Sequence, residues 1–350
     1  MIQVTVKASK EYQVIIGADL LASVGEHLKS LRKNGKAAIV SDSNVFPIYG
    51  AFVETSLRKS GFDTCSFILP AGEESKNIGN YTAILNFLAE NKLTRSDVLI
   101  ALGGGVVGDI TGFSAATYLR GISYIQIPTS LLAMVDSSVG GKTAIDLPAG
   151  KNLVGAFYQP ELVLCDVNTL NTLPQETFID GCAEVIKYGI LYDKDLFVHL
   201  QSDGLEFDLE TVISRCVSLK RDVVAEDEYD TGARQKLNLG HTIGHGVEAF
   251  SNFEITHGKA VAIGMMIVTK AGNSLGICDK NTLKAIRQIL TRFGLPVHTT
   301  AKADELLQFA LSDKKRAGGT INLIIPQAIG DCIIRPTPVD QLHAFIEAGL

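Results

Sequence analysis

The sequence predicts an α/β protein: a Rossmann-like domain with a mostly parallel sheet in residues 1–169, followed by a mainly α-helical domain in residues 170–350. Two observations support this fold class. Short apolar runs alternate with stretches of helical periodicity through the first half, which is typical of βαβ units. From about Leu170, long helical patterns replace that alternation, and no Pro/Gly-rich linker marks the change. We therefore expect no flexible joint, and a functional site between the two halves.

The elements of the first half follow from its apolar runs. The N-terminal MIQVTVKASKEYQVIIG alternates apolar and polar residues around a short polar turn, which predicts strand, turn and strand. Later runs of five or six mostly apolar residues predict buried strands, since parallel strands are covered on both faces. These strands lie at 37–42, 64–69, 98–102, 123–127 and 162–166, and helices are predicted up to Lys59 and at 79–91, 107–119 and 129–135.

The second half is predicted from longer periodic segments. Apolar residues recur at helical spacing in five stretches, at 176–191, 209–225, 238–250, 257–276 and 280–293. Near the end, TINLIIP and CIIRPT flank the turn-forming IGD, which indicates a small hairpin.

The composition narrows the class of protein. The net charge of −6 argues against a dedicated nucleic-acid binder. No segment reaches about 18 consecutive apolar residues, so we expect no membrane span. The first residues also lack the basic start and apolar run of a signal peptide. The 6 cysteines form no CxxC pair and indicate buried thiols in a cytoplasmic protein.

One segment, RQKLNLGHTIGHGVEAF, carries a row of polar side chains. Arg234, Asn238, His241 and His245 follow one another at spacings that place them within an arc of roughly 60° on one helix. A further histidine, His257, follows in THGKAVAIGMM. Imidazoles in such a row indicate a metal or an anion site.

A carboxylate in AEVIKYG could complete a metal site. Glu184 and Lys187 lie three apart on an apolar helix, either as an ordinary exposed ion pair or as a ligand beside a base. His241 and His257 with a carboxylate would form a site with open positions, as catalytic zinc prefers. His241 and His245 also have the HxxxH spacing that binds zinc, and the spacing does not decide which pair holds the metal.

The segment GGGVVGD, residues 103–109, follows a predicted strand and opens a predicted helix. Glycines there let backbone N–H groups approach a pyrophosphate at the start of the helix. The spacing departs from GxGxxG, so dinucleotide binding and a tight turn are both consistent with it. Asp42, at the end of a strand, could hold a ribose hydroxyl or cap a helix. Glu73 and Lys76 could contact the same ligand or pair with each other.

VGGKT, residues 139–143, resembles the end of a phosphate-binding P-loop. The first glycine of that motif is replaced by Asp136, which argues against nucleotide hydrolysis. Lys142 could still bind a phosphate as a point charge. Arg120, Lys151 and Asn152 lie nearby in the sequence, and such a cluster in an acidic protein indicates an anion site.

Together these segments resemble the 3-dehydroquinate synthase family, within the wider group of sugar-phosphate cyclases. The motifs are GGGVVGD, AATYLRGISYIQIPTSLLAMVDSSVGGKTAID, GKNLVGAFYQP, AEVIKYG, DEYDTGARQKLNLGHTIGHGVEA, HGKAVAIGM and the DKK at 313–315. The resemblance implies a lyase that converts 3-deoxy-D-arabino-heptulosonate 7-phosphate to 3-dehydroquinate and phosphate in the shikimate pathway. It also implies NAD that is reduced and reoxidised within one turnover, one divalent metal (zinc or cobalt), and a homodimer.

The resemblance further implies roles for individual residues. The metal ligands would be Glu184, His241 and His257. The phosphate-bearing end of the substrate would be bound by Arg120, which can come from a partner subunit, Lys142, Asn152, His245 and Lys315. Its carboxylate and hydroxyls would be held by Lys187, Lys220, Arg234 and Asn238. The NAD site would be lined by Asp42, Asn44, Glu73, Lys76, Gly104, Gly105, Val106, Asp109, Thr129, Ser130, Asp136, Lys142, Lys151 and Thr172.

Three alternatives remain from the sequence. A metal-dependent NAD polyol dehydrogenase would accumulate NADH, whereas the cyclase releases phosphate with no net change in NADH. A related cyclase would act on sedoheptulose 7-phosphate or glucose 6-phosphate. Lys220, Arg234 and Asn238 favour the heptulosonate, because its carboxylate calls for cationic or amide donors. A binding protein without activity would carry the buried polar row at a cost in stability.

Overall fold

The computed structural model describes residues 1–312 and 319–350, and the chain forms two compact units. Unit 1 comprises Met1–Pro174 and Leu209–Glu228, and unit 2 comprises Gln175–Asp208 and Tyr229–Leu350. The helix at 209–226 therefore belongs with unit 1, although it follows the change of sequence pattern. The assignment of NAD binding to residues 1–169 and of metal and substrate binding to residues 170–350 stays a prediction.

Unit 1 is built on a seven-stranded sheet with the order β1-β2-β9-β6-β5-β3-β4. The β1–β2 pair is antiparallel and the other neighbouring pairs are parallel, which confirms the predicted α/β class with a mostly parallel sheet. The strands are β1 (Ile2–Lys7), β2 (Glu11–Gly17), β3 (Gly35–Asp42), β4 (Phe62–Leu69), β5 (Val98–Gly103), β6 (Ser123–Pro128) and β9 (Leu162–Asp166).

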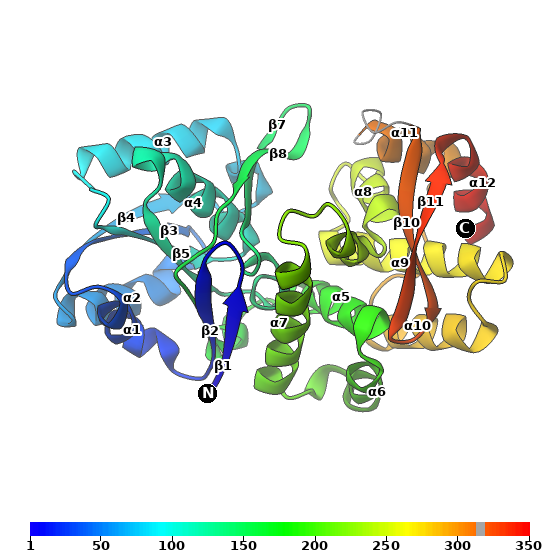
Figure 1. Cartoon of the computed structure of the whole chain (residues 1–350), viewed down its shortest axis with the longest axis horizontal. Helices are drawn as coiled ribbons and strands as arrows, with labels where there is room; N and C mark the ends of the chain where they lie inside the picture. The colour runs from blue at the N-terminus through cyan, green and yellow to red at the C-terminus, as the bar shows by residue number, and fades with distance from the viewer. Residues whose placement is uncertain (313–318) are drawn as a thin grey trace. The chain divides into compact units, whose positions relative to one another are not determined.

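Helices cover both faces of this sheet (Figure 1). Residues of α1 and α2 pack with Ile39 and Ile100 in one apolar core, and residues of α3 and α4 pack with Val40 and Leu99 in another. Successive strand residues thus enter opposite cores, which explains why these strands are continuous apolar runs. The helices of unit 1 are α1 (Val24–Leu31), α2 (Phe46–Lys59), α3 (Ile78–Glu90), α4 (Gly105–Thr117) and α7 (Leu209–Glu226), with short helices at Leu20–Ser23, Glu73–Ser75, Tyr118–Arg120 and Val167–Thr172.

Some elements of unit 1 were not predicted. β7 (Lys142–Leu147) and β8 (Gly150–Phe157) form a separate antiparallel hairpin, in a region that we had interpreted only as an anion-binding loop. The side chains of β8 are exposed or half-buried along its whole length, and Val154 and Ala156 pack against the apolar core that α3 and α4 also enter. The short helix predicted at 129–135 is centred instead on a π-helical turn, η4 (Ala133–Ser137).

Unit 2 is mainly helical, as predicted. Its long helix α9 is buried on most of its surface and packs against α5, α8, α10, α12 and β10. Its elements are α5 (Gln175–Tyr192), α6 (Lys194–Asp203), α8 (His241–Phe250), α9 (His257–Ser274), α10 (Lys280–Arg292), α11 (Ala303–Ser312), α12 (Val339–Gly349), β10 (Thr320–Ala328), β11 (Asp331–Pro338) and short helices at Gly204–Glu206 and Ala233–Asn238. Among the described residues, no helix has both the length and the apolarity required to cross a bilayer.

The helix that we predicted at 238–250, with Arg234 in the same row, is broken in the structure. Residues 233–238 form a 3₁₀ helix, η7, and α8 begins only at His241, after Gly240 with φ +80°. Two features require glycine at position 240. Its backbone is left-handed, and a Cβ there would lie 2.6 Å from the carbonyl oxygen of Val261. The prediction of one continuous helix was therefore wrong, and only the two histidines share α8.

Candidate active site

Three side chains of unit 2 converge on one point, and we call them the metal group: Glu184 of α5, His241 of α8 and His257 of α9. Glu184 Oε1 lies 3.5 Å from His241 Nε2 and 3.7 Å from His257 Nε2. One donor atom from each residue lies within 4.8 Å of the others. Ligands about 2.0–2.1 Å from a tetrahedral zinc are separated by about 3.3 Å, so the spacing of these donors suits such an ion.

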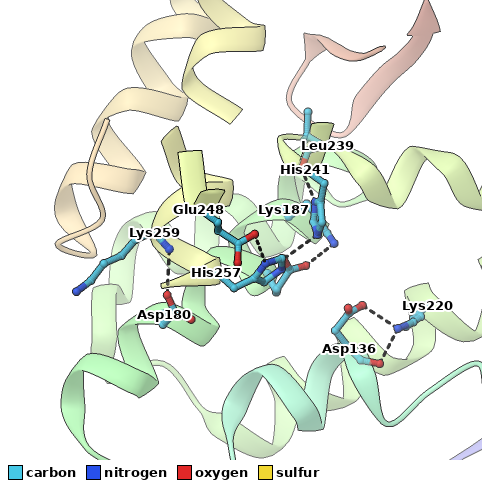
Figure 2. A network of polar contacts seen from close by, with 10 residues as sticks. Asp136, Asp180, Lys187, Lys220, Leu239, His241, Glu248, His257 and Lys259 are labelled. Atoms are coloured by element: carbon cyan, nitrogen blue, oxygen red, sulfur yellow. Dashed lines mark hydrogen bonds and ion pairs between the residues drawn. The ribbon is translucent and has the colours of Figure 1, made fainter. Parts of the chain in front are cut away.

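The outer nitrogens of both imidazoles are also held (Figure 2). His241 Nδ1 lies 3.1 Å from the carbonyl oxygen of Leu239, and His257 Nδ1 lies 3.4 Å from Glu248 Oε2. Each contact favours the tautomer in which Nδ1–H donates and the lone pair is on Nε2, the nitrogen that faces Glu184. Metal-bound histidines are oriented in this way in proteins. The donor set therefore fits a divalent cation.

Lys187 lies one turn along α5 from Glu184, and its ammonium forms a short ion pair with Glu184 Oε2. Both side chains are only 1% exposed, so the interpretation as an ordinary exposed pair was wrong. The two carboxylate oxygens face different partners: Oε2 faces the ammonium, and Oε1 faces the imidazoles. Lys187 thus fixes the orientation of the carboxylate within the metal group.

Burial and charge set the protonation of the two imidazoles when no cation is present. Burial and the positive charge of Lys187 lower the pKa of His241 to about 3. Burial also lowers the pKa of His257, but hydrogen bonds to Glu184 and Glu248 and their negative charges outweigh it and raise this pKa to about 10. A proton on His257 therefore provides the positive charge between the two carboxylates in the metal-free protein.

Close contacts between α5 and α9 fix the spacing of the metal group. One turn before Glu184, Asp180 Oδ1 accepts a short hydrogen bond from Thr256 Oγ1 and one of 3.0 Å from the backbone N–H of Lys259. This carboxylate caps the start of α9. A Cβ at Gly258 would lie 1.9 Å from the carbonyl oxygen of Asp180, so glycine is required at this approach.

The other predicted site residues of unit 2 lie around this group. His245 is exposed, and its ring centroid lies 5.6 Å from that of His241 and 6.0 Å from that of His257. Arg234 is buried and Asn238 is half-buried in η7, six and two residues before the break at Gly240. Lys315 lies outside the described residues.

In unit 1, the GGG segment connects β5 to α4 as predicted. β5 ends at Gly103 and α4 begins at Gly105, so the N–H groups of Gly105 and Val106 lie in the first turn of the helix, where anions are favoured. The backbone N–H of Thr129, directly after β6, donates to the carbonyl oxygen of Gly103 at 3.0 Å. A Cβ at Gly104 would lie 3.6 Å from Ser130 Oγ, so Ser130 lies beside the glycines.

Five predicted residues of unit 1 form one charged network. Lys76 Nζ lies 2.6 Å from Asp109 Oδ2 and 3.8 Å from Glu73 Oε1, and it donates a short hydrogen bond to Asn152 Oδ1. Lys151 Nζ lies 4.0 Å from Glu73 Oε1. Burial would lower the pKa of Lys76, but Asp109 and Glu73 raise it above its usual range. The structure thus brings together residues that the resemblance assigns to NAD and to phosphate.

A second predicted pair in unit 1 joins Lys220 of α7 to Asp136. Lys220 Nζ donates to Asp136 Oδ1 at 2.8 Å and to the Asp136 carbonyl oxygen at 2.6 Å (Figure 2). At the end of β3, Asp42 Oδ1 accepts from the N–H groups of Asn44 and Val45 at 2.8 and 3.0 Å. Asp42 therefore holds the turn before α2 but does not cap the helix, whose N-cap is Val45, and the ribose-binding interpretation of Asp42 stays a prediction.

The remaining predicted residues lie on short elements or at the edge of the hairpin. Lys142 is exposed at the start of β7, and Arg120 is exposed with φ +66°. The hydroxyl of Thr172 lies 2.5 Å from that of Tyr49. Two residues near the metal group were missed: Glu248 and Asp180. The H-x-x-E spacing from His245 to Glu248 was the available signal for the first, and no sequence signal marks the second.

Comparison with known proteins identifies relatives along most of the chain. Residues 66–180 match the family described as 3-dehydroquinate synthase N-terminal, and residues 181–316 match 3-dehydroquinate synthase C-terminal. The 3-dehydroquinate synthase of Clostridium acetobutylicum is 44% identical over 341 residues, with 96% of both chains covered. That of Synechocystis is 43% identical over 342 residues, with 95% of both chains covered.

Solved structures share the whole fold. A 2-deoxy-scyllo-inosose synthase, crystallised with carbaglucose-6-phosphate, NAD⁺ and Co²⁺, has a TM-score of 0.89 at 25% identity, with both chains fully covered. The 2-epi-5-epi-valiolone synthase of Streptomyces hygroscopicus, with NAD⁺ and Zn²⁺, has a TM-score of 0.88 at 25% identity over 98% of both chains. Glycerol dehydrogenase from Schizosaccharomyces pombe has a TM-score of 0.68 at 15% identity, covering 96% of this chain and 88% of that one, a likeness of fold alone.

Proposed function

The chain belongs to the 3-dehydroquinate synthase family, and we propose that it converts 3-deoxy-D-arabino-heptulosonate 7-phosphate to 3-dehydroquinate and inorganic phosphate. One observation on the molecule carries the proposal. Glu184 Oε1 faces the Nε2 atoms of His241 and His257 at 3.5 and 3.7 Å, and the Nδ1 atom of each imidazole is held from behind. This arrangement supports the metal-dependent chemistry of the family.

The cofactors in this proposal are NAD and one divalent cation, zinc or cobalt. Related cyclases were crystallised with NAD⁺ and with Co²⁺ or Zn²⁺, and the metal group offers the oxygen and nitrogen donors that such cations accept. When bound, the cation supplies Lewis acidity toward a substrate hydroxyl, and NAD accepts and returns a hydride.

The protein's own residues hold a flexible, highly charged substrate. Lys187 orients the Glu184 carboxylate, so that Oε1 faces the imidazoles. Lys187, Lys220, Arg234 and Asn238 supply donors for the carboxylate and hydroxyls of the substrate. Fixing several charged groups in one geometry lowers the barrier mainly through positioning and electrostatic stabilisation.

We propose that the phosphate-bearing end and the dinucleotide are bound by residues of several short elements. Arg120, Lys142, Asn152, His245 and Lys315 bind the phosphate in this proposal. The NAD site is formed by the start of α4, the turn after β3 and the Lys76 network, together with Thr129, Ser130, Asp136 and Thr172. The resemblance to the family also supports a homodimer in the cytoplasm, which light scattering and cell fractionation test.

One assay separates this function from its alternatives. The purified protein is supplied with NAD, zinc or cobalt, and the heptulosonate phosphate, and both released phosphate and absorbance at 340 nm are followed. We expect phosphate release without NADH accumulation, abolished by a chelator and restored by metal. NADH accumulation with a polyol would support the dehydrogenase. Faster turnover of sedoheptulose 7-phosphate or glucose 6-phosphate would support another cyclase.

A further inference from the structure

We propose that Glu248 is a positioning residue, which holds His257 in the orientation that directs Nε2 toward the cation. This inference depends on the metal site of the proposed function. Glu248 lies on α8, is 3% exposed, and brings its Oε2 to 3.4 Å from His257 Nδ1 (Figure 2). A buried carboxylate against the outer nitrogen of a ligating histidine is the arrangement that orients metal-bound imidazoles in proteins.

The ring of His257 lies between two carboxylates. Its Nε2 faces Glu184 Oε1 at 3.7 Å, and its Nδ1 faces Glu248 Oε2 at 3.4 Å. The two ring nitrogens point in different directions, so one nitrogen cannot serve both carboxylates. With a cation bound in place of the second proton, Nδ1–H would donate to Glu248 and Nε2 would offer its lone pair to the metal group. The contact with Glu248 thereby selects both the tautomer and the direction of the ring.

His257 needs such a contact more than His241 does. His241 Nδ1 lies 3.1 Å from the carbonyl oxygen of Leu239, an acceptor on the main chain only two residues away. The acceptor for His257 is a side chain nine residues away, on a different helix. The side chain of His257 is also 33% exposed, against 14% for His241, so less packing restrains its ring.

Helix α8 supplies both the ligand His241 and the carboxylate Glu248. The two residues lie seven apart, about two helical turns, which places them on the same face. The same helix also packs closely on α9, where a Cβ at Gly244 would lie 3.0 Å from the carbonyl oxygen of Ala260. The separation of the two helices, and hence the reach of Glu248 to His257, is set by this backbone contact.

A second arrangement of the same residues makes Glu248 a ligand instead. Donor atoms of His245, Glu248 and His257 also lie within 4.8 Å of one another. In the group with Glu184, the cation would be bound by Nε2 of His257. In the group with Glu248, it would be bound by Nδ1 of the same residue. The two arrangements therefore predict different results when Glu248 is replaced. The arrangement with Glu184 as the ligand is favoured, because in it both imidazoles face one buried carboxylate oxygen and each imidazole has an acceptor behind its Nδ1.

The test measures cation affinity of the metal-free, full-length protein. Zinc is titrated against a competing chelator, and Co²⁺ is followed by its visible absorption. We expect Glu248→Ala to weaken binding about 10- to 100-fold, the usual effect of removing an outer partner of a metal-bound histidine. Glu248→Gln should retain most of the affinity, because its amide oxygen accepts the same hydrogen bond. This variant also guards against a folding defect.

Asp193→Ala provides a matched control in unit 2. Asp193 accepts from the N–H of Leu196 and caps α6, directly after the end of α5, nine residues and about 13 Å of helix rise beyond Glu184. Its loss removes a similar side-chain contact without touching the metal group. We expect its affinity for both cations to stay within about twofold of the wild type.

A second measurement reports on the ring itself. In the Co²⁺-loaded wild type, proton NMR should show two strongly shifted, exchangeable Nδ1–H signals. Glu248→Ala should lose the signal of His257 to exchange and keep that of His241. Unchanged affinity with both signals present would overturn the proposal. Loss of binding as complete as in His257→Ala would also overturn it, since Glu248 would then be a ligand. A wild type that binds neither cation would refute the proposed function as well.

Discussion

Gly258→Ala should disrupt the metal group without changing any of its ligands. A Cβ at this position would lie 1.9 Å from the carbonyl oxygen of Asp180, and the neighbouring backbone atoms cannot rotate away. The start of α9 must separate from α5 by about 1.5 Å before the contact reaches the 3.4 Å of ordinary packing. His257 lies on α9 and Glu184 on α5, so this separation moves one ligand away from the other.

Two effects of this substitution can be estimated. Overpacking of this kind typically costs about 1–3 kcal/mol in the free energy of unfolding. A shift of about 1.5 Å also far exceeds the tolerance of about 0.2 Å in metal–ligand distances, so we expect zinc affinity to fall at least tenfold.

The assay combines urea unfolding of the metal-free protein with zinc titration against a chelator. Lys259→Ala is the matched control, because it changes the next residue, keeps the backbone N–H that donates to Asp180, and removes a half-buried side chain whose ammonium lies 3.8 Å from the exposed Glu176. Wild-type stability and zinc affinity in Gly258→Ala would refute the claim that this close approach fixes the metal group.

Three further predictions concern single side chains. His257→Ala should retain no zinc after gel filtration, while His245→Ala should retain it; zinc at the wild-type level in the first variant would remove His257 from the ligand set. Lys142→Ala should raise KM for the phosphorylated substrate more than it lowers kcat, and unchanged steady-state kinetics would show that the GGKT segment is only a turn. In the metal-free protein, the pKa of His257 is about 10, above its ordinary 6.5. The resulting stabilisation is complete below pH 6.5 and is lost as the pH rises toward 10, so His257→Ala should show a smaller loss of stability than the wild type over that range. Equal slopes in urea unfolding would contradict this assignment.

The sheet and the long helices could be predicted because burial on both faces leaves a direct pattern in the sequence. Strand β5 is apolar throughout, β3 carries the buried apolar run 37–40, and α9 is buried on most of its surface. The β7–β8 hairpin was missed because no residue of β8 is fully buried. Val154 and Ala156 are half-buried against a core, whereas Leu153 and Phe157 are exposed although apolar, so the sequence of β8 shows no alternation of apolar and polar residues. The break at Gly240 was missed for a different reason. A helical spacing continues through a glycine in the sequence, whereas the left-handed backbone at Gly240 and its close contact with α9 are set by tertiary packing.

The site shows the same division between local and tertiary information. His241 and His245 share one helix, as their spacing predicted. The approach of Glu184 to His241 and His257 does not follow from spacing, because the carboxylate lies 57 residues before the first imidazole and its position depends on how α5 packs against α9. Before the structure, the residue types allowed Glu184, His241 and His257 to form a two-His, one-carboxylate site, but only the family resemblance chose this set over the His241–His245 pair. Asp180 and Glu248 were missed because each acts through a contact between helices.

The measurement that tests the central claim most directly is anomalous X-ray diffraction at the zinc or cobalt absorption edge on metal-loaded crystals. We predict one strong peak about 2.0–2.2 Å from Glu184 Oε1, His241 Nε2 and His257 Nε2. A peak bound instead by His245 and Glu248, or one with no contact to Glu184, would contradict the account.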